Sequence, residues 1–253
     1  MPLAAHFAEF RRRLLLAVLG VVLGAVGGWF LFTPVFDAIQ QPLLDAAARD
    51  DTIININFST LLSAFDVRLK VSLFIGLLVT SPWWLYQFWA FVTPGLNRKE
   101  RRYSLAFVFT AVPMFLIGAS LGWLLLPHAV LVLTEFVPHG STNLADAQLY
   151  LSFVLRLMIA FGLAFVLPVV MVVINLAGLV RASTWAKGWR WAVVVAFTFA
   201  AVMTPTPDAW TMILVALPIC LLYVVALGLC LLHDRSADRR QQALLSDDSL
   251  TTI

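Results

Sequence analysis

Long apolar runs separated by short polar segments make up most of this 253-residue chain. A helical run of about 20 residues, rising 1.5 Å per residue, crosses a hydrocarbon core about 30 Å thick. Backbone polar groups in lipid need internal partners, so runs of this length predict helices. We therefore predict an all-α polytopic membrane protein with six transmembrane helices, at residues 14–32, 67–92, 103–126, 151–176, 189–203 and 210–232.

The same pattern predicts one membrane domain over residues 1–232. The polar segment 233–253 is rich in Ser, Asp and Gln, and we expect it to be a disordered tail. The first run could be taken for a signal peptide. However, its 19 apolar residues exceed the apolar region of a secretory signal peptide, which has about 7 to 15 residues, and no A-x-A-like cleavage site follows. We therefore predict a helix that is retained in the mature protein.

Composition agrees with a bilayer environment. The chain is 61% hydrophobic and 12% charged, whereas soluble domains are about 45–50% apolar and about 25% charged. This excludes an ordinary soluble globular domain.

Positive charge alternates between the polar segments. Thirteen of the 17 Lys and Arg residues fall in the N-terminal segment, two alternate loops and the C-terminal segment: Arg11, Arg12, Arg13, Arg98, Lys99, Arg101, Arg102, Arg181, Lys187, Arg190, Arg235, Arg239 and Arg240. Positively charged segments stay in the cytoplasm. Both termini are therefore predicted to be cytoplasmic.

Prolines and glycines predict how the helices pack. Prolines inside four runs (Pro82, Pro113, Pro168 and Pro218) predict kinks, and kinked helices favour a concave, cup-like wall. A glycine stripe on the first helix (Gly20, Gly24 and Gly28) has the spacing of a close helix contact. Packing within the chain is favoured, and contact with another protein stays open.

Enzymatic motifs are weak. The string GASLG contains Ser120 in a G-x-S-x-G pattern, but a nucleophile needs a nearby base, and none of the four histidines lies in a predicted span. Glycines four residues apart favour helix packing instead. Cys220 and Cys230 are ten residues apart and favour apolar packing over a disulfide or metal site. We expect no enzyme, cofactor or metal, and no nucleic-acid partner.

The cluster NRKERR at residues 97–102 combines four cations with Glu100. The cations are explained by membrane orientation alone, because positively charged loops stay in the cytoplasm. Orientation does not explain the glutamate. Glu9 and Glu100 are the acidic residues that the predicted topology places on the cytoplasmic side before the fourth loop. A carboxylate can bind a guanidinium through two strong hydrogen bonds. The alternative is a weak salt bridge from each glutamate to Arg13 or Arg102.

Several motifs resemble the TatC family of twin-arginine protein translocases. HFAEFRRRL (6–14) is similar to the family's N-terminal signature, and LYQFWAFVTPGL with NRKERR (85–102) to its signature around the first cytoplasmic loop. Three further strings are similar to family motifs and occur in the same order along the chain: QQPL (40–43), YLSFVL with AFG (150–162) and TPTPD (204–208).

The resemblance implies a receptor subunit in the bacterial inner membrane that binds the twin-arginine signal peptides of folded proteins. It implies TatA- and TatB-type single-span partners and transport driven by the proton-motive force, and self-association stays open. By motif match it assigns signal-peptide binding to Glu9, Glu100, Phe91, Pro94, Arg11 and Arg13, and a further functional position to Pro42.

The family commonly carries two glutamates within membrane helices. This chain has Val166 and Val224 at those positions instead. Asp208 matches a family position, and Arg156 lies within a predicted span, where an ionisable residue is a functional candidate. For Arg156, an anchor that reaches the interface and a polar contact remain equal alternatives. Two other functions stay open: a small-solute secondary transporter and, less favoured, an intramembrane serine protease.

Overall fold

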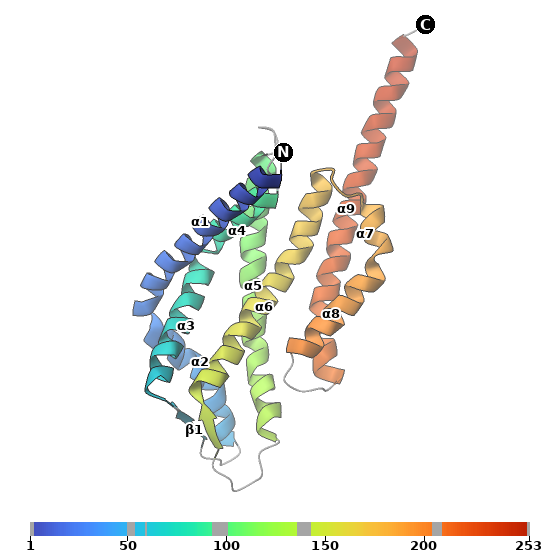
Figure 1. Ribbon diagram of the computed structural model, residues 1–253. Coiled ribbons are helices and arrows are strands. Elements are labelled where there is room, and N and C mark those ends of the chain that lie inside the picture. Colours follow the sequence, from blue (N-terminus) through green and yellow to red (C-terminus); the bar gives the residue numbers. More distant parts are fainter. Residues whose placement is uncertain are drawn as a thin grey trace. The chain divides into compact units, whose positions relative to one another are not determined.

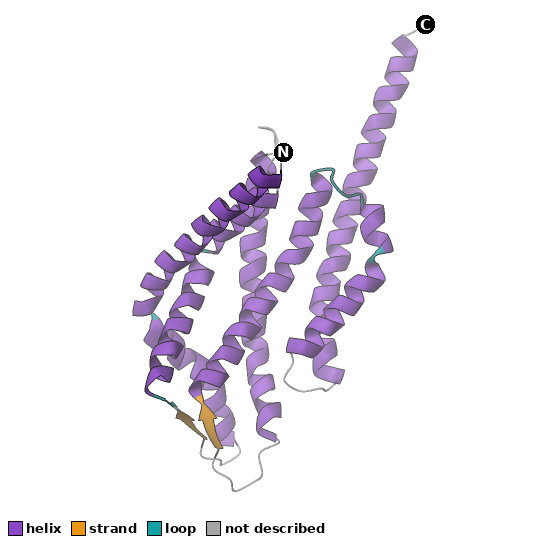
Figure 2. Ribbon diagram, in the orientation of Figure 1, coloured by secondary structure: helices purple, strands orange, loops and turns teal. Residues whose placement is uncertain are grey.

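The computed structural model describes residues 3–49, 54–58, 60–92, 101–135, 143–203 and 209–251, which form nine helices and two short strands (Figures 1 and 2). The chain divides into two compact units. Unit 1 comprises Met1–Val166 with Met203–Thr206, and unit 2 comprises Leu167–Val202 with Pro207–Ile253.

Unit 1 is built mainly from helices that lie side by side (Figure 1). Its elements are α1 (Leu3–Phe30), α2 (Phe32–Arg49), β1 (Ile54–Asn57), α3 (Leu61–Val79), α4 (Ser81–Val92), α5 (Arg101–Glu135), β2 (Asn143–Asp146) and the first part of α6 (Ala147–Leu176).

The two strands form a small parallel ladder that the all-α prediction omitted, with Ile54 opposite Asn143. Each strand leads into a capped helix. Thr60 Oγ1 accepts the Ser63 amide at 3.1 Å at the start of α3, and Asp146 Oδ1 accepts the Gln148 amide at 2.8 Å at the start of α6. The ladder therefore fixes two helix starts at one end of unit 1.

The predicted helix 67–92 is two helices, α3 and α4, which meet at Thr80. Thr80 has φ −90° and ψ 13°, which ends α3. Pro82 is then the second residue of α4, in the first turn, where a backbone N–H needs no partner within the helix. The other three prolines predicted to bend spans lie inside the continuous helices α5, α6 and α9 (Ala209–Thr251).

The glycine stripe of α1 packs within the chain, as the sequence favoured. A Cβ atom on Gly28 would lie 2.6 Å from the Ser72 carbonyl oxygen of α3. From the α3 side, a Cβ atom on Gly76 would lie 2.5 Å from the Ala25 nitrogen. The two backbones approach so closely that only glycine fits at these positions.

The core of unit 1 joins α2, α3, α5 and the start of α6. Its buried side chains include Ile39, Val67, Val71, Leu126, Leu151 and Val154. The Tyr150 hydroxyl donates a 2.9 Å hydrogen bond to the Ile39 carbonyl, which ties α2 to α6. Tyr150 opens the YLSFVL motif, so the structure gives this motif residue a packing role.

Unit 2 contains the end of α6, α7 (Ala182–Lys187), most of α8 (Trp189–Met203) and α9. The Asp234 carboxylate of α9 accepts hydrogen bonds from the buried Asn175 side chain at 2.9 Å and from the Ala182 amide at 2.7 Å. Asp234 thus ties α9 to the turn after α6. The helix α9 runs to Thr251, through the segment where the sequence predicted a disordered tail.

Four described stretches are long and apolar enough to cross a membrane: His6–Phe30, Leu105–Leu131, Ala147–Leu176 and Val215–Arg239. Helix α8 is apolar but shorter, and the second predicted span is divided between α3 and α4. Several apolar helices of this length indicate a multi-pass membrane protein.

Candidate functional site

The first turns of α1 lie against α4 in unit 1 (Figure 1). The ring of Phe91 lies 4.8 Å from that of His6 and 5.1 Å from that of Phe10, measured between centroids. Further along α4, Trp83 Nε1 donates a 2.8 Å hydrogen bond to the Leu16 carbonyl of α1. These contacts place Phe91 at the amino-terminal end of α1.

A polar chain of three side chains connects the same two helices. Arg13 Nε donates to Glu9 Oε1 at 2.7 Å, one turn back on α1. Arg13 Nη1 donates to Gln87 Oε1 of α4 at 3.2 Å. Gln87 is buried, and its amide is therefore held in place by packing. The Arg13 guanidinium bridges a fixed amide and the Glu9 carboxylate.

Glu9 stays accessible in this arrangement. Its side chain is 34% exposed and that of Arg13 is 26% exposed. Ion pairs that are open to solvent contribute about 0 to 1 kcal/mol, and both side chains of this half-buried pair keep part of their surface in solvent. The salt bridge to Arg13 that the sequence left open is present, and it is weak enough for a second guanidinium to compete for Glu9.

The structure brings together only part of the predicted site. Glu9, Arg13 and Phe91 meet at the α1–α4 contact, whereas Arg11 is exposed on α1, with no ion pair among the described residues. Three predicted residues lie outside the described residues: Pro94, Glu100 and Asp208.

The two remaining predicted residues lie elsewhere in unit 1. Pro42 is inside α2, which lies toward the end of the unit that carries β1 (Figure 1). Arg156 lies in α6, where it lines a pocket.

Sequence reasoning missed Gln87, His6 and Phe10. Gln87 is an isolated polar residue in an apolar run, four residues after Trp83 and four before Phe91. Residues four apart share one helix face. That spacing was the available signal that Gln87 faces the same neighbour as the two aromatic residues.

The departures from the family pattern have different surroundings. Val166 is buried, whereas Val224 is 65% exposed.

In the GASLG string, Ser120 is exposed, while Gly118 and Gly122 lie against α6. A Cβ atom on Gly118 would lie 2.5 Å from the Phe161 carbonyl oxygen. The glycines of this string therefore have the packing role that the sequence favoured.

Comparison with known proteins gives a consistent result. Residues 5–218 match the family described as Sec-independent protein translocase protein (TatC). A protein of Xylanimonas cellulosilytica with this name is 59% identical over 95% of this chain and 87% of its own length. A protein of Rothia mucilaginosa with the same name is 36% identical over 95% of this chain and 82% of its own length.

A solved structure agrees with these relatives. The crystal structure of a twin-arginine translocase receptor, TatC, in DDM matches with a TM-score of 0.75 and 29% identity. The match covers 89% of this chain and 99% of the crystallised one.

Proposed function

Because the chain belongs to the TatC family of Sec-independent protein translocases, we propose that it is the receptor that binds twin-arginine signal peptides of folded cargo. The Glu9–Arg13–Gln87 arrangement carries this proposal. It presents an accessible carboxylate beside an aromatic cluster at the end of α1.

One arginine of the signal binds Glu9, and the other binds Glu100. Arg13 is held by Gln87, so an incoming guanidinium can take over Glu9 without removing Arg13 from its place. An arginine bound through both carboxylate oxygens makes two charge-assisted hydrogen bonds, each about twice as strong as a neutral one. The present pair has one such bond, at 2.7 Å. This difference favours the exchange.

The rest of the proposal concerns placement and partners. The protein lies in the bacterial inner membrane with both termini in the cytoplasm and six spans: α1, α3 with α4, α5, α6, α8 and α9. The distribution of Lys and Arg supports this orientation. The receptor works with TatA- and TatB-type single-span subunits, which carry out transport after the signal is bound.

Charge reversal tests the binding site. Glu9→Lys and Glu100→Lys should each abolish crosslinking of a twin-arginine signal peptide to membranes containing the protein. Asp37→Lys is the matched control, because Asp37 is an exposed acid on α2, and it should crosslink as the parent does. Unchanged crosslinking in both glutamate variants rejects the proposed site.

A further inference from the structure

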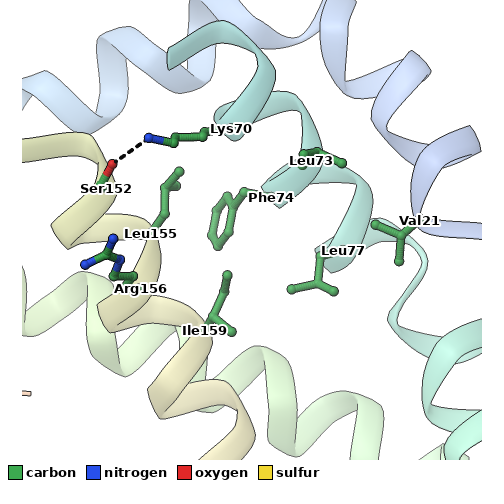
Figure 3. A pocket seen from close by; sticks show the side chains of 9 residues that line it. All are labelled: Val21, Lys70, Leu73, Phe74, Leu77, Ser152, Leu155, Arg156 and Ile159. Carbon is green, nitrogen blue, oxygen red and sulfur yellow. Dashed lines mark hydrogen bonds between the residues drawn. The ribbon is translucent and has the colours of Figure 1, made fainter. Parts of the chain in front are cut away.

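A pocket of about 340 Å³ lies within unit 1, between α3 and α6, with α1 at its edge (Figure 3). Three of its lining residues are polar: Lys70, Ser152 and Arg156. The other six are apolar: Val21, Leu73, Phe74, Leu77, Leu155 and Ile159. The pocket is therefore apolar along most of its wall and basic along one side.

The two cations line the pocket at the same part of α6. Lys70 Nζ donates a 3.3 Å hydrogen bond to Ser152 Oγ, and Ser152 and Arg156 are one turn apart on the same helix. Residues with this spacing have Cβ atoms about 5–6 Å apart. Figure 3 shows Lys70 directed at Ser152, with Arg156 on the next turn.

The local charges do not cancel. Lys70 is paired with Asp66 at 2.6 Å. Arg156 is exposed and has no hydrogen bond or ion pair among the described residues. An unpaired cation in a membrane helix is costly, so it marks a place where a negative charge binds.

The depth of Arg156 suits a lipid headgroup. The 30-residue helix α6 is about 45 Å long, so Arg156, nine residues from its start, lies about 8 Å from its middle. The hydrocarbon core extends about 15 Å on each side of the membrane centre. An arginine at this depth reaches the headgroup boundary with its side chain.

We propose that this pocket binds one anionic phospholipid, with the phosphate between Arg156 and Lys70 and an acyl chain along the apolar wall. Charge complementarity selects the anionic headgroup, and the apolar lining selects a lipid over a free phosphate. The inference goes beyond signal recognition, because none of its residues belongs to the α1–α4 site.

Native mass spectrometry of the purified full chain tests the proposal. The protein is delipidated in detergent and titrated with an equal mixture of phosphatidylglycerol and phosphatidylcholine. The parent should retain phosphatidylglycerol in preference to phosphatidylcholine. Arg156→Leu should weaken retention of phosphatidylglycerol about fivefold, the effect of one cation near a lipid headgroup. Arg239→Leu, which removes an exposed cation in the C-terminal part of α9, should retain phosphatidylglycerol as the parent does.

Two further arms make the test specific. Ile159→Trp fills the apolar wall and should also reduce phosphatidylglycerol retention, whereas inorganic phosphate at equal concentration should not displace the lipid. If Arg156→Leu lowers the melting temperature, Arg156→Lys should keep the preference and Arg156→Gln should lose it.

Three results would overturn the proposal. The first is equal retention of the two lipids by the parent. The second is displacement by inorganic phosphate, which would indicate a free-anion site. The third is equal phosphatidylglycerol retention by the Arg156→Leu and Arg239→Leu variants, as expected if the pocket instead receives a carboxylate on a partner's membrane helix.

Discussion

Arg13 is the residue that organises the proposed signal site. Its guanidinium has a rigid, planar set of donors, so it can contact Glu9 and Gln87 at the same time. Lysine would offer a single charged centre there. The motif match predicted that Arg13 and Glu9 matter, but it did not predict that Arg13 is anchored on α4. The four-residue spacing shows which residues share a helix face with Gln87, but not which helix that face contacts.

Replacing Gln87 tests this anchor. Gln87→Leu keeps the volume roughly constant but leaves Arg13 Nη1 without its acceptor, so we expect the free energy of unfolding to fall by about 1–3 kcal/mol. Signal-peptide affinity should fall as well, because Arg13 is no longer held by Gln87 and can stay bound to Glu9 in competition with the incoming arginine. Denaturant unfolding in detergent and peptide titration measure the two effects.

Gln41→Leu serves as the control, because Gln41 is exposed and bonds only to Asp45 on its own helix. It should change stability by less than about 0.5 kcal/mol. Equal stability of the two variants would show that the Gln87 contact does not hold Arg13.

Among the helices, the apolar runs predicted most elements but not their interruptions. Pro82 predicted a kink in the second run, but hydropathy does not show that one helix ends there and another begins, as the structure has it at Thr80 and Ser81. Helix α2 escaped prediction because it is amphipathic, with Ile39 and Leu43 buried and Asp37 and Gln41 exposed. The strands are only four residues long, and their pairing joins segments far apart in the sequence.

Neighbouring glycines on α1 test the close contact with α3. Gly28→Ala should lower the free energy of unfolding by about 1–3 kcal/mol, because the added methyl group meets the Ser72 carbonyl. Gly27→Ala should leave stability unchanged or raise it by up to about 1 kcal/mol, because nothing lies within 4 Å of the new atom and alanine is the better helix former. Thermal unfolding in one detergent compares them. Similar losses in both variants would argue against the close approach.

For the whole molecule, the ordered motifs were enough to predict the family, which the relatives confirm. The motifs succeed because they combine positions that local physics does not connect, such as Glu9 on α1 and Tyr150 on α6. The lipid pocket had no such signal. Lys70 and Arg156 are far apart in the sequence, and only the packing of α3 on α6 places them on one pocket.

Orientation is tested by labelling single cysteines with a membrane-impermeant maleimide in intact cells. In a background with Cys220→Ser and Cys230→Ser, Asp45→Cys on α2 should react from outside. Ser236→Cys on α9 should react only after permeabilisation. Both positions are exposed in the structure, so accessibility depends on the side of the membrane. The opposite labelling pattern would reverse the proposed topology.

Recognition of the arginine pair by Glu9 and Glu100 is the central claim, and a double-mutant cycle measures it most directly. Two peptides are compared: a twin-arginine signal peptide and the same peptide with glutamine in place of one arginine. The affinity of each is measured for the purified parent and for Glu9→Gln. The cycle is then repeated with the other arginine and Glu100→Gln. A direct contact predicts a coupling energy of about 1.5–3 kcal/mol for one arginine with each glutamate. Changes that add to within about 0.5 kcal/mol for every arginine–glutamate pair would contradict it.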